Sequence, residues 1–303
     1  MGIGGGLARA LAQELVARGH SVMGMDRRGW HEAPRAVKVF QHDLRKRAAE
    51  DVFRKEKPDC VVHMATLSAL AAETEERHRM NLGGTRAVFE HCATYGIGQL
   101  VFVGRHTFYG ASHESAMYHS EDEPPQALEA FPELSDLVAA DMYASNALWR
   151  SPKMTTAVLR LVYTLGPSRQ GTLAGFLRGK RTPMVLGYDP LFQFLWESDA
   201  VDALVLAVEK KARGVFNVAG PPPLPLSTIV RETGRTPVPL PEPILRGLLG
   251  RFGFPSLPRG ALEHLKFPIV IDAKAFAKAT GFKWSVNEVE ALARFRALAP
   301  PPR

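Results

Sequence analysis

The chain has 303 residues, of which 46% are hydrophobic and 23% charged, a composition typical of one large or two smaller globular domains. Its 38 basic and 31 acidic residues give a formal charge of +7, but the basic residues are dispersed, which disfavours a nucleic-acid-binding face. No apolar run reaches the roughly 18 residues of a membrane span, and no secretory signal pattern opens the chain. We expect a cytoplasmic protein without a membrane partner, in which Cys60 and Cys92 are reduced.

Helix and strand patterns alternate through the first two-thirds of the chain. Apolar residues at helical spacing predict helices at 7–18, 51–57, 80–95 and 137–150. Short apolar runs predict strands at 21–25, 60–64, 99–104 and 155–162. This alternation is typical of βαβ units, so we predict an α/β fold with a doubly wound parallel sheet.

The rhythm changes after Gly166-Pro167. A short helix at 173–178 and a strand at 184–186 precede an amphipathic helix at 198–211, which Ser198 or Asp199 is predicted to cap. A last strand at 215–218 leads into a proline-rich remainder. We therefore divide the chain into a main domain, 1–165 with 191–220, and a smaller substrate-binding lobe, 166–190 with 221–303.

Small residues at the start of the chain predict a dinucleotide site of the Rossmann type. Gly2, Gly5 and Ala8 form a GxxGxxA pattern followed by a helix and then a strand. The first glycine permits a tight turn, the second lets backbone approach a pyrophosphate, and the third small residue lets the helix pack closely on the sheet. The helix N-terminus then offers N–H groups to phosphate, so the predicted cradle includes Gly2, Gly4, Gly5, Gly6 and Leu7.

The strand that follows this helix ends in Asp26. An acidic residue about 20 positions beyond the glycines is where a carboxylate holds the adenosine ribose. A carboxylate repels a 2′-phosphate, so Asp26 favours NAD as the cofactor. Arg27 and Arg28 follow at once and could bind that phosphate, which leaves NADP as the alternative.

Only Met1 precedes the glycine turn, although a Rossmann domain places a buried strand there. We expect this first strand to be truncated, with the true start about six to ten residues upstream, because losing a central strand outweighs the roughly 5–15 kcal/mol that stabilises a domain.

These motifs, in their order and spacing, make the chain resemble the extended short-chain dehydrogenase/reductases, in particular the NAD-dependent epimerase/dehydratase family. The resemblance covers essentially the whole chain and includes the following further pieces: Asp43-Leu44, 58–65, 81–85, 108–110, Tyr143, Leu159-Arg160 with Gly166-Pro167, and 217–220.

The resemblance implies roles for several of these residues. Asp43 and Leu44 would flank the adenine, whereas Met64, Ala65 and Thr66 would line the cofactor beyond their strand. Asn81 would support the active-site helix. The segment after Arg160 would approach the nicotinamide.

The catalytic centre departs from the family pattern. The family uses a tyrosine with a lysine four residues later, whose cation lowers the phenol pKa from about 10. Tyr143 is present, but Ala147 stands at the lysine position, and Arg105 stands where the family has a serine or threonine. We predict a degenerate site of Tyr143, Arg105, His106 and Thr107, in which Arg105 or His106 supplies the cation.

Two functions stay open from the sequence. The first is oxidation, reduction or epimerisation at a carbinol carbon, on a small molecule such as a nucleotide sugar. The second is a catalytically silent protein that senses the cofactor or serves as a scaffold. RNA binding by the same fold rests on net charge alone.

Other clusters carry less weight. His106, His113 and His119 lie near acidic residues, but their spacing matches no helical metal motif, so no metal site is predicted. The family often dimerises through two helices per subunit, and the resemblance therefore implies a homodimer.

Overall fold

The computed structural model describes residues 1–67, 74–251 and 254–302, and its centre is a parallel four-stranded sheet. The strand order is β10-β5-β4-β3, formed by Gly214–Val218, Thr155–Leu161, Gln99–Arg105 and Cys60–His63. Residues 99–105 pair in register with 155–161 along their whole length. The predicted strands at 60–64, 99–104, 155–162 and 215–218 are therefore present and adjacent.

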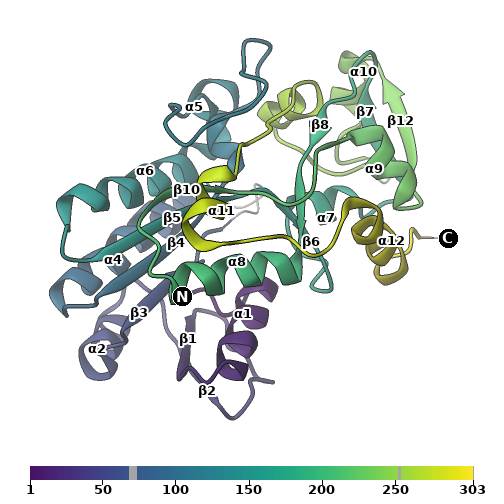
Figure 1. Cartoon of the computed structure of the whole chain (residues 1–303). Helices are drawn as coiled ribbons and strands as arrows, with labels where there is room; N and C mark the ends of the chain where they lie inside the picture. Colours follow the sequence, from purple (N-terminus) through teal and green to yellow (C-terminus); the bar gives the residue numbers. More distant parts are fainter. Residues whose placement is uncertain (68–73, 252–253, 303) are drawn as a thin grey trace.

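Helices cover both faces of this sheet (Figure 1). On one face, Val101 and Leu159 pack with residues of α1 (Gly6–Ala17), α8 (Glu197–Glu209) and α11 (Lys274–Thr280). On the other, Leu100 and Val158 pack with residues of α2 (Arg47–Glu56), α4 (Gly84–Thr94) and α6 (Ser135–Arg150). Alternate strand residues thus face two apolar cores, which confirms the predicted doubly wound α/β fold.

Two further strands, β1 (Val22–Asp26) and β2 (Val37–Gln41), pair in parallel but form a separate sheet. The sequence did not predict β2. Met1 joins the two sheets: its amino group donates to the Val62 carbonyl at 2.7 Å, and its carbonyl accepts from Met64 N–H at 3.1 Å. The next residue, Gly2, donates to the Met25 carbonyl of β1 at 2.7 Å.

A cavity of about 370 Å³ separates β1 from β3, and residues of α1 and α2 close it. Among the described residues no strand lies in this slot, and beyond Met25 and Val62 the facing backbone edges are without a sheet partner. The truncation expected from the sequence stays a prediction, but the slot has the apolar lining and the two open edges that a central parallel strand requires.

We expect a six-residue Val/Ile-rich segment fused ahead of Met1 to fill this slot and stabilise the fold. Each buried valine or isoleucine contributes about 1.5–3 kcal/mol, so Tm should rise by at least about 5 °C. Thermal unfolding checks this against a Gly/Ser extension of equal length. Equal Tm values for the two extensions would contradict the expectation.

The smaller lobe lies beyond one end of the main sheet (Figure 1) and has its own apolar core. Its strands form three two-stranded pairs: β6 (Tyr163–Leu165) with β9 (Phe194–Trp196), β7 (Arg181–Val185) with β12 (Thr236–Leu240), and β8 (Leu191–Phe192) with β11 (Leu224–Pro225). Its helices are α7 (Thr172–Phe176), α9 (Leu226–Glu232), α10 (Glu242–Leu248), η4 (Arg259–Leu265) and α12 (Glu288–Leu298).

The boundary between the two parts differs from the predicted one: Leu165, Phe194 and Trp196, assigned to the main domain, belong to the core of the smaller lobe. Part of the segment assigned to the smaller lobe packs on the main sheet instead. Ile269, Ile271, Phe276 and Phe282 belong to the core formed by α1, α8 and β5. The remaining short elements connect the main strands and comprise α3 (Thr74–His78), η1 (Arg79–Gly83), η2 (His106–Tyr109), α5 (Ala127–Ala130) and η3 (Pro132–Leu134).

The predicted cap of the amphipathic helix is wrong. Helix α8 begins at Glu197, and no side chain caps it. Asp199 lies inside the helix, where its carboxylate accepts hydrogen bonds from the backbone of Ser285 and Val286. The carboxylate therefore fixes the segment before α12 rather than the start of α8.

A buried ion pair ties α6 to the centre of the sheet. The Arg160 guanidinium on β5 donates to the Asp141 carboxylate of α6 at 2.9 Å, and both side chains are almost wholly buried. Arg160 also donates to the Tyr109 hydroxyl at 2.9 Å, which in turn donates to Asn217 at 2.8 Å. The network thus joins β5, β10, α6 and η2.

Removing one partner of this pair should destabilise the fold strongly. Arg160→Met leaves the Asp141 carboxylate buried without its cation, so we expect a loss of about 3–5 kcal/mol in urea unfolding. The double variant Arg160→Met/Asp141→Leu should recover much of that loss. Arg246→Met, which breaks an exposed pair with Glu242, is the control and should cost at most about 1 kcal/mol.

Candidate functional site

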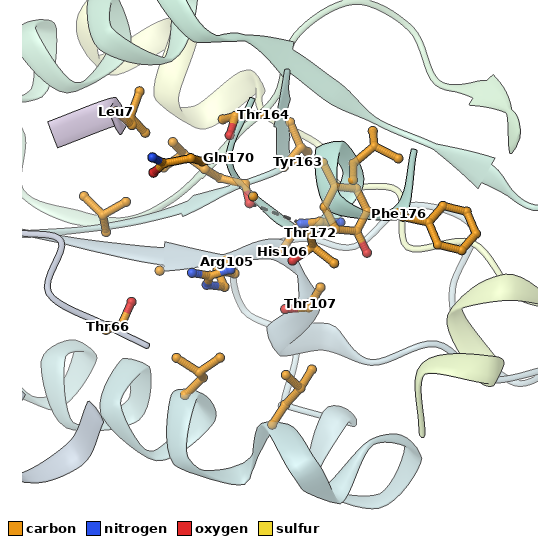
Figure 2. A pocket seen from close by; sticks show the side chains of 18 of the residues that line it. Leu7, Thr66, Arg105, His106, Thr107, Tyr163, Thr164, Gln170, Thr172 and Phe176 are labelled. Carbon is orange, nitrogen blue, oxygen red and sulfur yellow. Dashed lines mark hydrogen bonds between the residues drawn. The ribbon is translucent and has the colours of Figure 1, made fainter. Parts of the chain in front are cut away.

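A cavity of about 270 Å³ opens at the carboxyl ends of β4 and β5, between the glycine turn and the smaller lobe. In a parallel α/β sheet this is the edge at which ligands bind. Its walls come from the glycine turn, the end of β4, the segment 161–164, α7 and η4. Figure 2 shows the side chains that face it.

Gly2 forms the sharpest part of the glycine turn. Its φ is +87°, a conformation that favours glycine, and a Cβ here would lie 2.8 Å from the backbone of Met64. The Gly5 N–H donates to the Gly2 carbonyl at 3.1 Å and closes the turn. Any side chain at position 2 would force the turn away from β3.

Gly6 opens α1 at the rim of the cavity. A Cβ on this residue would meet Ser168 at 2.4 Å, so the two chain segments could not approach as they do. The Gly6 N–H donates to the Gln170 side-chain oxygen at 2.9 Å. An acceptor oxygen therefore already occupies the helix N-terminus, where phosphate would bind. Of the predicted cradle, Gly2, Gly5, Gly6 and Leu7 line the cavity, whereas Gly4 does not and its N–H donates to Asp26.

Asp26 lies at the end of β1, directly beside the cradle. Its carboxylate accepts from the Gly4 N–H at 3.1 Å and from the Arg28 N–H at 2.8 Å. Arg27 points to another partner, since its guanidinium pairs with Glu76 at 2.6 Å. Arg28 is exposed, and its Nε lies 3.7 Å from Asp26 and 3.2 Å from where a Cβ on Gly4 would be, so the Asp26 carboxylate and the Arg28 side chain both lie beside the turn.

The other residues implied for the cofactor divide into two groups. Met64 and Thr66 line the cavity after β3. Ala65 and Leu44 contribute to the core behind β3 and β4 instead. Asp43 is half-buried and bound to Arg45 through two side-chain hydrogen bonds, which lower the Asp43 pKa to about 2.

Asn81 lies away from the cavity and is wholly buried. Its amide accepts from Leu67 N–H at 2.6 Å and donates to the Leu67 carbonyl and to Asp136. Asp136 also pairs with Arg77 at 2.8 Å. Asn81 thereby fixes Leu67, four residues after β3, against the start of α6.

Arg105, His106 and Thr107 all line the cavity, as Figure 2 shows. The Arg105 guanidinium makes no ion pair or hydrogen bond with any residue that the structure describes. His106 Nδ1 lies 3.1 Å from the Leu161 carbonyl, and its ring meets the Tyr163 ring edge-on at 4.4 Å. Burial lowers the pKa of His106 to about 3, so this ring is neutral at pH 7.

Tyr143 was expected at the centre of the site, but the structure places it elsewhere. Its ring packs edge-on against Phe89 at 5.8 Å and under the Arg150 guanidinium at 4.0 Å, and it does not line the cavity. Only the start of α6 reaches the cavity, through Leu137 and the preceding Leu134. Tyr143 lies eight residues beyond Ser135, which places it about 12 Å farther along the helix axis.

The structure adds Tyr163 to the site, which the sequence analysis had noted only as part of a segment approaching the nicotinamide. Tyr163 is the only tyrosine among the described residues that line the cavity, and it stacks on Phe192 at 5.5 Å. Burial raises its pKa while the Arg105 cation lowers it, with burial dominant. The sequence signal that could have identified Tyr163 is its position three residues after Arg160, in the segment implied to approach the nicotinamide.

The histidines near the acidic run do not converge. His106 lies in the cavity, whereas His119 stacks on Tyr109 and contacts Glu123 at 2.6 Å. Within residues 1–67, 74–251 and 254–302, no three His, Cys, Asp or Glu side chains come together as a metal site would require. No helix of these segments is long and apolar enough to cross a membrane.

The buried histidines predict acid sensitivity. Burial lowers the pKa of His106 to about 3 and of His264 to about 4, whereas an unfolded histidine titrates near 6.5. Below about pH 6.5 the unfolded chain therefore binds more protons, and the free energy of unfolding falls as the pH drops toward 4.

Thermal unfolding between pH 7 and pH 5 measures this dependence. His264→Leu should flatten it, because one buried titrating ring is gone. The exposed His113→Gln variant is the control and should keep the wild-type slope. Parallel slopes for wild type and His264→Leu would contradict the expectation.

Comparison with known proteins agrees with this geometry. The NAD dependent epimerase/dehydratase family matches residues 1–219. An uncharacterized protein of Mycobacterium tuberculosis is 28% identical over 256 residues, which cover 81% of this chain and 68% of that protein. The 3-diazoavenalumate denitrifying reductase of a Streptomyces species is 27% identical over 266 residues, or 83% and 86% of the two chains.

The fold is also similar to that of solved enzymes. The Thermus thermophilus UDP-glucose 4-epimerase, solved in complex with NAD, superposes with a TM-score of 0.76 at 21% identity. The superposition covers 97% of this chain and 96% of the epimerase. The likeness extends over both the main sheet and the smaller lobe.

Proposed function

Because the chain belongs to the NAD dependent epimerase/dehydratase family, we propose that it is an NAD(H)-dependent enzyme acting at a carbinol or carbonyl carbon of a small molecule. The observation that carries this proposal is the continuity of the cavity. One wall is the glycine turn with Asp26 beside it, and the opposite end holds Tyr163 and Arg105.

The residues of the cradle fit NAD. Backbone N–H groups at the start of α1 would hold the pyrophosphate after the hydrogen bond from the Gly6 N–H to the Gln170 side chain is broken. The Asp26 carboxylate would accept the adenosine ribose hydroxyls, and Met64 with Thr66 would line the path toward β4. When bound, NAD supplies a nicotinamide that accepts or donates a hydride.

Tyr163 is the residue that we propose moves the accompanying proton. Its hydroxyl makes no hydrogen bond with any described residue, and its ring is held between His106 and Phe192. A raised phenol pKa keeps the hydroxyl protonated and able to donate to a substrate oxygen in the reducing direction.

The silent, cofactor-sensing alternative is favoured by one observation. The part of α6 that reaches the cavity presents only Leu137, with Leu134 just before it, so no phenol or ammonium stands there. Turnover separates the two functions, since a sensor binds NADH without oxidising it.

Membership of the family does not define the class of substrate. The relatives include enzymes named for UDP-glucose and a reductase named for a diazo compound. A nucleotide sugar is therefore one candidate substrate for this chain.

We also propose a homodimer. Met142 and Trp149 are exposed on α6, the latter to 84% of its surface, which leaves apolar area for a second subunit to cover. Sedimentation measures the state.

Cofactor preference tests the role of Asp26. Asp26→Gly removes the carboxylate that repels a 2′-phosphate and leaves Arg28 free to bind one, so we expect the NADH/NADPH affinity ratio to fall by at least about 10-fold. Fluorescence titration with each cofactor measures it. Asp51→Asn is the control because that partly exposed carboxylate pairs with Arg54 on α2 and does not line the cavity.

The proton-transfer role predicts a split between two tyrosines. Tyr163→Phe should lower kcat by about 10²–10⁴-fold, because the proton donor is lost while the ring stays. Tyr143→Phe should retain activity, since its ring lies outside the cavity. NADH oxidation with a panel of sugar nucleotides, keto acids and ketones measures both, and the reverse result would refute the assignment.

A further inference from the structure

We propose that the substrate end of this cavity binds a compact, largely apolar molecule through a single carboxylate seated on Arg105, and that it is not built for a nucleotide sugar. This inference rests on the proposed function and narrows its substrate.

The first observation is the charge of the cavity. Among the described residues that line it, Arg105 is the only lysine, arginine, aspartate or glutamate. The two lining histidines, His106 and His264, are neutral because burial lowers their pKa values. The cavity wall therefore carries one permanent positive charge.

The second observation is that the Arg105 guanidinium has no ion-pair partner among the described residues. Arg105 is half-buried at the end of β4, and no described carboxylate lies within ion-pair distance of it. The three buried arginines of the described residues all have partners: Arg77 pairs with Asp136, Arg160 pairs with Asp141, and Arg235 donates to backbone carbonyls. A guanidinium withdrawn from water favours an anion, and its planar fork matches a carboxylate.

The third observation is the apolar character of the walls around Arg105. The polar side chains facing this end of the cavity include Thr107, Tyr163, Thr172 and His264. The larger side chains around them are apolar and comprise Phe131, Leu134, Leu137, Phe176, Phe192 and Leu265. These apolar side chains suit an aromatic or branched aliphatic body, and burying sugar hydroxyl groups against them would remove the water partners of those hydroxyls.

The balance of charge disfavours a second nucleotide. A nucleotide sugar brings a diphosphate in addition to the cofactor's own pyrophosphate. The N-terminus of α1 serves the cofactor, and α7, which also begins at the cavity with Thr172, has only five residues. Arg105 alone would have to neutralise the charge of the second diphosphate, whereas the single charge of one carboxylate equals that of the Arg105 guanidinium.

The test compares two matched probes that differ only in charge. Cinnamate and cinnamamide are titrated calorimetrically against wild type, with and without NAD⁺, and UDP-glucose is the third ligand. We expect cinnamate to bind at least about 10-fold more tightly than cinnamamide, because a charge-assisted hydrogen bond is made only by the acid. UDP-glucose should bind more weakly than cinnamate.

Variants locate the effect. Arg105→Met should abolish the preference for cinnamate, and Arg105→Lys, which keeps the charge without the fork, should retain part of it. Arg178→Met removes an exposed arginine that does not line the cavity and should behave as wild type. The Tm of each variant confirms that it is folded.

Three results would overturn the inference. They are equal affinity of the acid and the amide for wild type, tighter binding of UDP-glucose than of cinnamate, and a loss of NAD⁺ binding confined to Arg105→Met, which would assign Arg105 to the cofactor. Failure of wild type to bind NAD⁺ would instead refute the proposed function, while the titrations without cofactor still decide the charge preference.

Discussion

The architecture of this protein depends on the close approach of backbone at Gly2. In its left-handed conformation this residue donates to β1 and lies against the Met64 backbone after β3, a distance that leaves no room for a Cβ. The turn thereby brings the N-terminus of α1, the Asp26 carboxylate and the segment 64–66 to one place. Everything assigned to the cofactor follows from that contact, because these groups come from three separate elements.

At the other end of the cavity, electrostatics set the constraints. An apolar wall makes any charge costly unless a partner meets it, and Arg105 is the single permanent charge there. The histidines beside it stay neutral, and Tyr163 stays protonated. The same low polarity thus holds a phenol ready to donate and leaves one cation for an anionic substrate.

The elements of the main sheet could be predicted because their apolar runs are buried on both faces and their helices are amphipathic. Strand β2 escaped prediction since it has only five residues and most of them are not buried. The cap expected at Ser198 or Asp199 was wrong because a tertiary contact to Ser285 outweighed the local capping bond. Tyr143 was placed in the site wrongly because residue spacing predicts the face of a helix on which a side chain lies, but not which turn of the helix reaches the cavity.

The sequence by itself determined the glycine turn, the acidic residue after β1 and the alternating elements. These are local properties, fixed by backbone freedom, side-chain charge and the period of burial. Only the tertiary structure decided which groups share the cavity. It moved Tyr143 out, brought Tyr163 in, and left Arg105 without a carboxylate among the described residues, because those positions depend on how α6 and the smaller lobe pack against the sheet.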